Sequence, residues 1–162
     1  MITVRRAGEF DAREMAGLLD AIIRKGGTTA HTKPVSRDSL LEWMHRAPTR
    51  SAWFVAETDA GEIKGFQFIE PHHELGPDVG DIATFVAIGE TGFGIGSKLF
   101  EKTKSAAQAL GYRWINATIR ADNAGGLAYY QSRGFEDYAF HPDVPLANGQ
   151  IVDRISKRFD LT

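Results

Sequence analysis

Three glycines in alternating positions, Gly92, Gly94 and Gly96, separate a short apolar segment from a longer one with helical spacing. Residues 82–86 are mostly apolar and predict a strand, whereas residues 97–110 repeat apolar side chains every three or four positions and predict a helix. Because glycine lacks a Cβ atom, successive N–H groups of such a turn can point at one anion near the positive end of the helix dipole. The chemistry predicted for this turn is phosphate binding, and the alternative is a glycine-rich turn without a ligand.

Two widespread phosphate-binding patterns do not fit this turn. The dinucleotide fingerprint G-x-G-x-x-G requires a third glycine where the chain has Ser97 or Leu99, depending on the glycine from which it is counted. The P-loop pattern requires a lysine directly after its last glycine, and Lys98 comes one residue too late. A second signal is therefore needed to identify the ligand.

That second signal follows a predicted strand at residues 114–119. Asn123 is followed by Tyr130-Gln131-Ser132-Arg133-Gly134-Phe135, which resembles the N…Y-x-x-x-G-F ending of the GCN5-related N-acetyltransferase superfamily. The turn that begins at Thr91 resembles the Q/R-x-x-G-x-G/A signature of the same superfamily. The resemblance implies an acetyl-CoA-dependent N-acetyltransferase.

The resemblance also implies which residues hold acetyl-CoA. The N–H groups near Val86 and Ile88 would polarise the thioester carbonyl, and Asn123 would contact the pantetheine arm. Thr91 stands where the family usually has Arg or Gln, so one side-chain contact to the pyrophosphate is expected to be missing. The complete predicted cofactor-binding set is Val86, Ile88, Thr91, Gly92, Phe93, Gly94, Ile95, Gly96, Ser97, Asn123 and Tyr130.

Acetyl transfer to an amine needs a group that takes protons from the ammonium and one that protonates the departing thiolate. Tyr130 matches the family tyrosine, and a phenol with an ordinary pKa of about 10 can act as that acid. Asp81 precedes the strand predicted at residues 82–86. The branch of the superfamily named in the next paragraph commonly has glutamate at this position, and Asp81 is the predicted base. An aspartate with an ordinary pKa of about 3.9 needs a raised pKa or a bridging water for this role. A loop histidine as the base, or Asp81 as a group that only orients the ammonium, are alternatives.

Within the superfamily the chain is most similar to the branch that acetylates phosphinothricin, methionine sulfoximine and related amino acids. This likeness rests on residues 28–29 and 34–36, on Trp43 and on Asp81. It implies direct transfer, in a ternary complex, to the primary amine of a small molecule such as an amino acid or analogue. The residues predicted to bind this substrate are Thr28, Thr29, His72 and His73. Acetylation of a protein or peptide amine, and acyl-CoA sensing without turnover, are the competing functions.

The whole chain limits the function classes further. Its 162 residues predict one domain, residues 1–162, and the absence of cysteine excludes disulfides, thiolate zinc sites and a cysteine nucleophile. No metal site is predicted. The net charge of −2, with scattered basic residues, argues against a nucleic-acid partner. We expect no membrane segment and a cytoplasmic location. The exposed edge of the sheet could pair with a second copy of the chain, and such a homodimer would be compatible with catalysis.

The periodicities predict the element order β-α-α-β-β-β-α-β-α-β-β. The expected strands are residues 2–5, 52–57, 63–69, 82–86, 114–119, 135–141 and 151–160, and the expected helices include residues 10–24, 97–110 and 127–132. Asp11 and Ser36 are expected to cap the first two helices. With the resemblance, the predicted fold class is α/β (mixed α+β): a central mixed, mostly antiparallel twisted sheet of six or seven strands flanked by about four helices.

Overall fold

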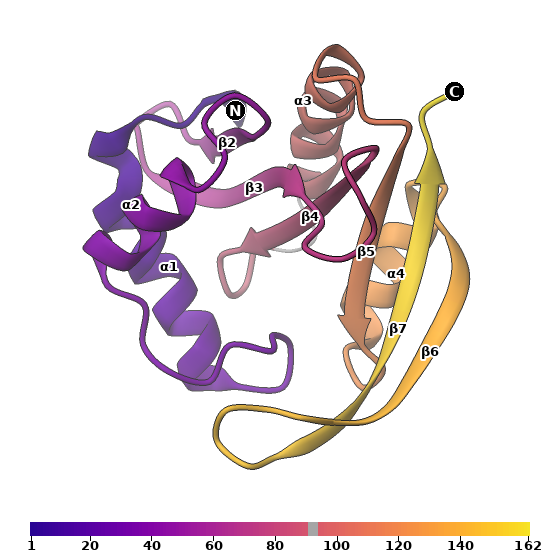
Figure 1. Ribbon diagram of the computed structural model, residues 1–162. Coiled ribbons are helices and arrows are strands. Elements are labelled where there is room, and N and C mark those ends of the chain that lie inside the picture. Colours follow the sequence, from indigo (N-terminus) through magenta and orange to yellow (C-terminus); the bar gives the residue numbers. More distant parts are fainter. Residues whose placement is uncertain (91–93) are drawn as a thin grey trace.

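The computed structural model describes residues 1–90 and 94–162, and its elements follow the predicted order (Figure 1). The strands are β1 (Thr3–Arg6), β2 (Ala52–Glu57), β3 (Ile63–Pro71), β4 (Val79–Val86), β5 (Trp114–Arg120), β6 (Glu136–Pro145) and β7 (Ile151–Asp160). The helices are α1 (Ala12–Lys25), α2 (Arg37–His45), α3 (Ile95–Ala109) and α4 (Ala124–Ser132), with a short 3-10 helix, η1 (Glu9–Asp11), before α1. In the described part of the chain, no helix is long and apolar enough to cross a membrane.

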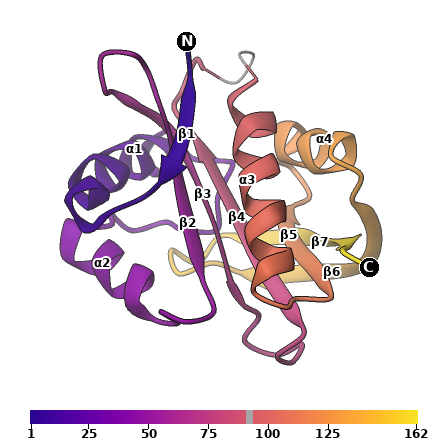
Figure 2. The same ribbon diagram turned by 90° about the horizontal axis from the view of Figure 1, so that it is seen from above.

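The strands form one seven-stranded sheet in the order β1-β2-β3-β4-β5-β7-β6. Every neighbouring pair is antiparallel except β4 and β5, which are parallel because α3 connects them. Helices α1 and α2 cover one face of the sheet, and α3 and α4 lie on the other (Figure 2). The predicted fold class is confirmed.

Alternating side chains of the central strands fill two separate cores. Ile82 of β4 packs with Leu99 of α3 on one face, and Phe85 of β4 packs with Leu19 of α1 on the other. The sheet is therefore apolar on both faces along β3 and β4. Two covered faces explain the nearly continuous apolar runs in these strands.

The pairing between β4 and β5 stops after three positions. Within the described residues, Val79, Gly80 and Asp81 pair with the first three residues of β5, and no pair follows toward Val86. On its other side, β4 remains paired with β3 as far as Val86. The two parallel strands thus diverge from Asp81 onward, and this divergence opens one end of the sheet (Figure 1).

Strand β4 begins earlier than its local sequence suggests. It starts at Val79 rather than at residue 82, so Asp81 lies inside β4 and not before it. Gly80 has no room for a side chain, because a Cβ atom there would lie 2.6 Å from Ile69 Cδ1. Close packing between neighbouring strands therefore selects this glycine, which is otherwise a poor strand former.

Of the two expected helix caps, Ser36 caps its helix and Asp11 does not. The Ser36 hydroxyl accepts a hydrogen bond from the N–H of Ser39 at 3.1 Å, as predicted for the start of α2. The Asp11 side chain does not cap α1; its carboxylate accepts from Gly8 N at 2.7 Å and forms a bidentate ion pair with Arg5. An arginine within reach offers the carboxylate stronger hydrogen bonds than the helix N–H groups do.

We expect Gly80→Ala to lower the free energy of unfolding by about 1–3 kcal/mol, because the new methyl group overpacks the contact with Ile69. Gly17→Ala is the matched control, since Gly17 is exposed in the middle of α1 and its added Cβ meets nothing within 4 Å. That control should stabilise the protein by up to about 1 kcal/mol through helix propensity. Urea unfolding measures both, and equal stability of Gly80→Ala and the parent would contradict the packing argument.

Candidate active site

A cavity of about 800 Å³ opens where β4 and β5 diverge. Its walls come from the segment after α1, from β3, β4, β5 and β7, and from the first turns of α3 and α4. Ten of the predicted site residues line it: Thr28, Thr29, Asp81, Val86, Ile88, Gly94, Gly96, Ser97, Asn123 and Tyr130. Ile95, His72 and His73 do not line it, and Thr91, Gly92 and Phe93 lie outside the described residues. The structure therefore brings most of the predicted residues to one place.

Backbone N–H groups of β4 face this cavity. Ala87 N, just after β4, donates to Lys64 O of the neighbouring strand β3 at 2.8 Å. Because backbone groups alternate sides along an antiparallel strand, the N–H groups of Thr84 and Val86 point away from β3, toward the space that β5 leaves open. Buried N–H groups need a partner, so this strand edge suits a ligand with carbonyl oxygens.

The glycine turn leads into α3 by two different devices. Gly94 is the N-cap residue and has φ +74°, a left-handed conformation that glycine adopts without strain. Gly96, by contrast, is helical, and its missing side chain makes room for Tyr129. A Cβ atom on Gly96 would lie 2.6 Å from Tyr129 Cε1, and the Tyr129 hydroxyl donates to Gly96 O at 2.7 Å. Ile95 is 2% exposed and packs in the core, which leaves only its backbone near the turn.

Tyr130 is buried in the cavity wall with its hydroxyl 2.7 Å from Thr84 Oγ1. Gln67 Nε2 donates to Thr84 Oγ1 at 2.9 Å and to the Tyr129 hydroxyl at 3.1 Å, so one amide fixes both groups. Burial raises the pKa of the Tyr130 phenol well above its ordinary value, and it raises the pKa of Tyr129 to about 12. Both phenols therefore keep their protons at neutral pH.

Asp81 is a partly buried carboxyl whose environment opposes ionisation. Burial raises its pKa, against the opposing effects of a hydrogen bond from Asn116 Nδ2 at 3.0 Å and of the charges of His72, His73 and Arg154. The raised pKa is the condition that a carboxylate base needs for an amine substrate. Asn116 is completely buried and also donates to Thr118 Oγ1 at 3.0 Å, so its amide is held in place.

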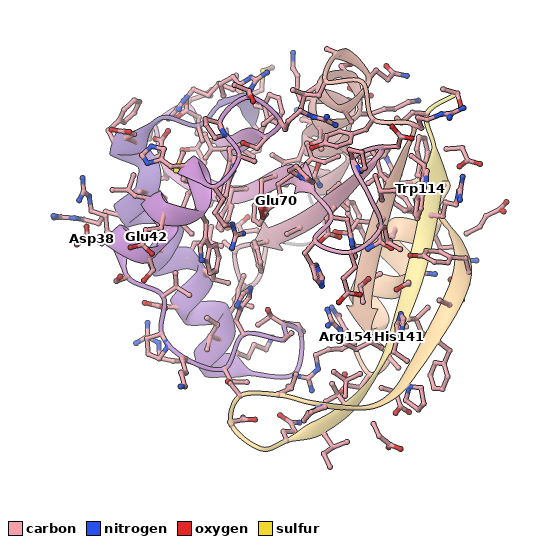
Figure 3. All side chains as sticks on the ribbon, in the orientation of Figure 1. Asp38, Glu42, Glu70, Trp114, His141 and Arg154 are labelled. Carbon is pink, nitrogen blue, oxygen red and sulfur yellow. The ribbon has the colours of Figure 1, made fainter. Side chains whose placement is uncertain are left out.

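Glu70 is a second carboxylate that sequence patterns did not identify. It lies directly across from Asp81 in the β3–β4 register and lines the same cavity, near the end of β3 (Figure 3). Arg46 Nη2 pairs with Glu70 Oε1 at 2.5 Å. Burial raises the pKa of Glu70, and the Arg46 pair opposes that shift. Glu70 is thus engaged by a cation, whereas the Asp81 side chain, among the described residues, is bonded to the Asn116 amide alone.

The segment after α1 is tied to the far side of the cavity. Arg120 Nη1 donates to Thr29 O at 3.1 Å, and Asn123 Nδ2 donates to Thr28 O at 3.1 Å. Asn123 also caps α4, since its Oδ1 accepts from Gly126 N at 3.0 Å. The two threonines are thereby held over the cavity through their carbonyl groups, and both ends of the Asn123 amide have protein partners.

The two loop histidines lie outside the cavity wall. His72 Nδ1 accepts from the N–H groups of Glu74 and Leu75 at 3.0 and 3.1 Å, which places the ring proton on Nε2. Burial lowers the pKa of His72, and His73 stacks on it with ring centroids 4.6 Å apart. A lone pair that accepts two N–H groups cannot take a substrate proton without losing both bonds, so this geometry disfavours His72 Nδ1 as a base.

Comparison with known proteins finds that the chain is similar to acetyltransferases. Residues 19–135 match the family model described as "Acetyltransferase (GNAT) family". The chain is 24% identical over 154 residues, 94% of each chain, to "Putative phosphinothricin acetyltransferase YwnH" of Bacillus subtilis (strain 168). The yncA structure from Salmonella typhimurium, a "putative acetyltransferase" solved with acetyl-CoA, is similar with a TM-score of 0.89 at 20% identity, over 99% of this chain and 94% of that one. A ribosomal-protein-alanine N-acetyltransferase from Brucella melitensis has a TM-score of 0.88 at 20% identity, over 98% and 99% of the two chains.

We expect Asp81→Asn to be more thermally stable than the parent at pH 8. The folded-state pKa of Asp81 is raised above its unfolded value, so the stability present at low pH is lost as pH rises through the folded pKa. The asparagine retains an oxygen for Asn116 and cannot ionise. Melting temperatures at pH 8 and near pH 3.5 measure this, with exposed Asp78→Asn as the control. A stability gain that persists unchanged at the lower pH would contradict the titration argument.

Proposed function

Because this chain belongs to the acetyltransferase (GNAT) family and is an acetyl-CoA-dependent N-acetyltransferase, we propose that it transfers the acetyl group directly to a small-molecule primary amine. The proposed acceptor is an amino acid or amino-acid analogue, bound together with acetyl-CoA in a ternary complex. The observation that carries the proposal is the single cavity that joins the glycine turn, the buried Tyr130 phenol and the Asp81 carboxyl. The absence of cysteine agrees with direct transfer, since no thiol can carry the acetyl group.

The residues of this cavity suit acetyl-CoA. The N–H groups of Thr84 and Val86 point toward the opening beside β5, where they would donate hydrogen bonds to amide and thioester oxygens of the cofactor. Gly94 and the N-terminus of α3 provide a positive end for the pyrophosphate. Acetyl-CoA supplies the activated acetyl thioester.

We assign the proton-handling roles to Asp81 of β4 and to Tyr130 of α4, which contacts Thr84 of β4. Asp81 takes a proton from the acceptor ammonium, directly or through a water, and its raised pKa brings the carboxylate closer to the basicity this step requires. Tyr130 holds its proton at the hydroxyl, and Thr84 fixes the direction of that hydroxyl. The phenol is the proposed donor to the thiolate.

A small acceptor is favoured by the segment that closes the cavity. Residues 28–31 line the cavity, and the carbonyl groups of Thr28 and Thr29 accept hydrogen bonds from Asn123 and Arg120. A long peptide would have to displace these bonds. The relative named for phosphinothricin, an amino-acid analogue, supports the same class of acceptor.

The proposal is tested by measuring CoA-thiol release from acetyl-CoA with purified protein and separate amino acids, amino-acid analogues, polyamines and short peptides. Release that depends on amino acids or analogues is the expected result. Release with peptides alone would replace the small acceptor by a protein amine. Tight acetyl-CoA binding without release for any acceptor would favour a sensor.

We expect Tyr130→Phe to lower kcat by about 100-fold, because only the proton donor is removed, and to leave the acetyl-CoA Kd nearly unchanged. Tyr129→Phe is the neighbouring contrast: it loses the bond to Gly96 O, so it should weaken acetyl-CoA binding more than it lowers kcat. Steady-state kinetics and calorimetric titration separate the two effects. Equal kcat for Tyr130→Phe and the parent would remove Tyr130 from the mechanism.

A further inference from the structure

Arg154 is an arginine in the cavity wall whose side chain has no partner among the described residues. The neighbouring arginines are neutralised: Arg46 pairs with Glu70 at 2.5 Å, and Arg120 pairs with Asp122 at 2.8 Å. Within residues 1–90 and 94–162, the Arg154 side chain forms neither an ion pair nor a hydrogen bond, and its Nε atom is buried without an acceptor. The cavity therefore contains a cationic group with unused hydrogen-bond donors.

An unpartnered guanidinium in a wall of this kind is costly to the folded protein. Burial lowers the pKa of Arg154, because a guanidinium in the cavity wall is partly removed from water. Desolvated charges are normally found with a counter-ion, and a guanidinium offers two parallel N–H donors that match a carboxylate. The missing partner is most simply an anionic ligand.

The strand register places Arg154 on the same face of the sheet as Asp81. Arg154 pairs with Arg120, and Asp81 pairs with Asn116, four residues earlier on β5. Four residues correspond to about 13 Å along a strand, so the two groups approach the cavity from different ends. Figure 3 shows Arg154 beside the end of β5, away from Glu70 near the end of β3.

The charge of Arg154 acts across the cavity without a direct pair. Burial raises the pKa of Asp81, and the charge of Arg154 opposes this rise, as Asn116 and the two histidines do more strongly. The pKa of His31 is lowered by burial and by the charges of Arg46 and Arg154. Asp81 and Arg154 nevertheless form no ion pair with each other, since the strand register keeps them four positions apart along β5 and Asp81 is bonded to Asn116. One cavity thus presents a separated anion and cation.

We propose that Arg154 binds the α-carboxylate of the acceptor amino acid while the acceptor ammonium faces Asp81. This inference rests on the proposed function and makes Arg154 a specificity-determining residue rather than a group that handles protons. It explains why a cation without a protein partner lies on the same face as the proposed base. The acceptor class that follows is a free amino acid, with its α-carboxylate unblocked.

The first test compares each amino acid with its own α-amide in the wild-type protein. CoA release measures turnover, and calorimetric titration into the protein–CoA complex measures binding without turnover. We expect KM and Kd to be about 10- to 100-fold lower for the acids than for the amides, as hydrogen bonds to a charged group provide. Equal values for acid and amide would overturn the inference.

The second test uses Arg154→Met, which retains the length and apolar packing of the side chain. The preference for acid over amide should disappear, while the acetyl-CoA Kd and kcat with the amides stay near wild type. Arg158→Met is the matched control, since Arg158 lies on the same strand and face, pairs with Asp160 and does not line the cavity. Arg154→Lys retains the charge without the bidentate geometry and should retain part of the preference.

Stability provides a readout that separates ligand binding from a structural role. Arg154→Met should melt at the same or a higher temperature than the parent, because it removes an unpartnered charge. A lower melting temperature together with an unchanged acid preference would assign Arg154 to the fold and overturn the inference.

The tests also separate this inference from the proposed function. Turnover only of amines that lack a carboxylate would leave an N-acetyltransferase of small amines and refute the role of Arg154. Absence of turnover for every small amine, with amino acids still bound through Arg154 in the CoA complex, would refute the proposed function and retain the anion site.

Discussion

The short pairing between β4 and β5 is the constraint on which the rest of the site depends. Asp81 and Asn116 form its last position, and their side chains are joined there by a hydrogen bond. Beyond them β4 stays in register with β3, so its other edge is left with N–H groups facing a cavity. A sheet that remained closed would pair those groups internally and would leave no room between the strands for a ligand.

The sequence predicts the element order because apolar spacing is preserved in most elements. The expected ranges at residues 52–57 and 151–160 agree with β2 and β7 residue for residue. The start of β4 was wrong, since Gly80 and Asp81 have low strand propensity and are held there by neighbours on both sides. The strand predicted at residues 135–141 ended too early, because β6 continues to Pro145 against β7.

Local motifs predicted the glycine turn, Asn123 and Tyr130, whose spacing is contained in one stretch of chain. The groups that position these residues had no such signal. Gln67 and Thr84 meet the tyrosines only through the pairing of β3 with β4 and the packing of α4. Arg154 enters the cavity from the last strand, and only the register of β7 on β5 brings it there. Register depends on tertiary packing, so single-sequence patterns do not reveal it.

A row of polar side chains on β5 and β7 also shows why Asp81 and Arg154 remain apart. Asn116 gives one amide hydrogen bond to Asp81 and another to Thr118, and Thr118 Oγ1 lies 2.9 Å from Ser156 Oγ on the next strand. These hydrogen bonds hold the Asp81 carboxylate at the level of Asn116. The pairing of β7 with β5 holds Arg154 opposite Arg120, four residues away along β5. Collapse of the two charges into an internal ion pair would consume both groups. A hydrogen-bonded row between them keeps each available to a ligand that carries both charges.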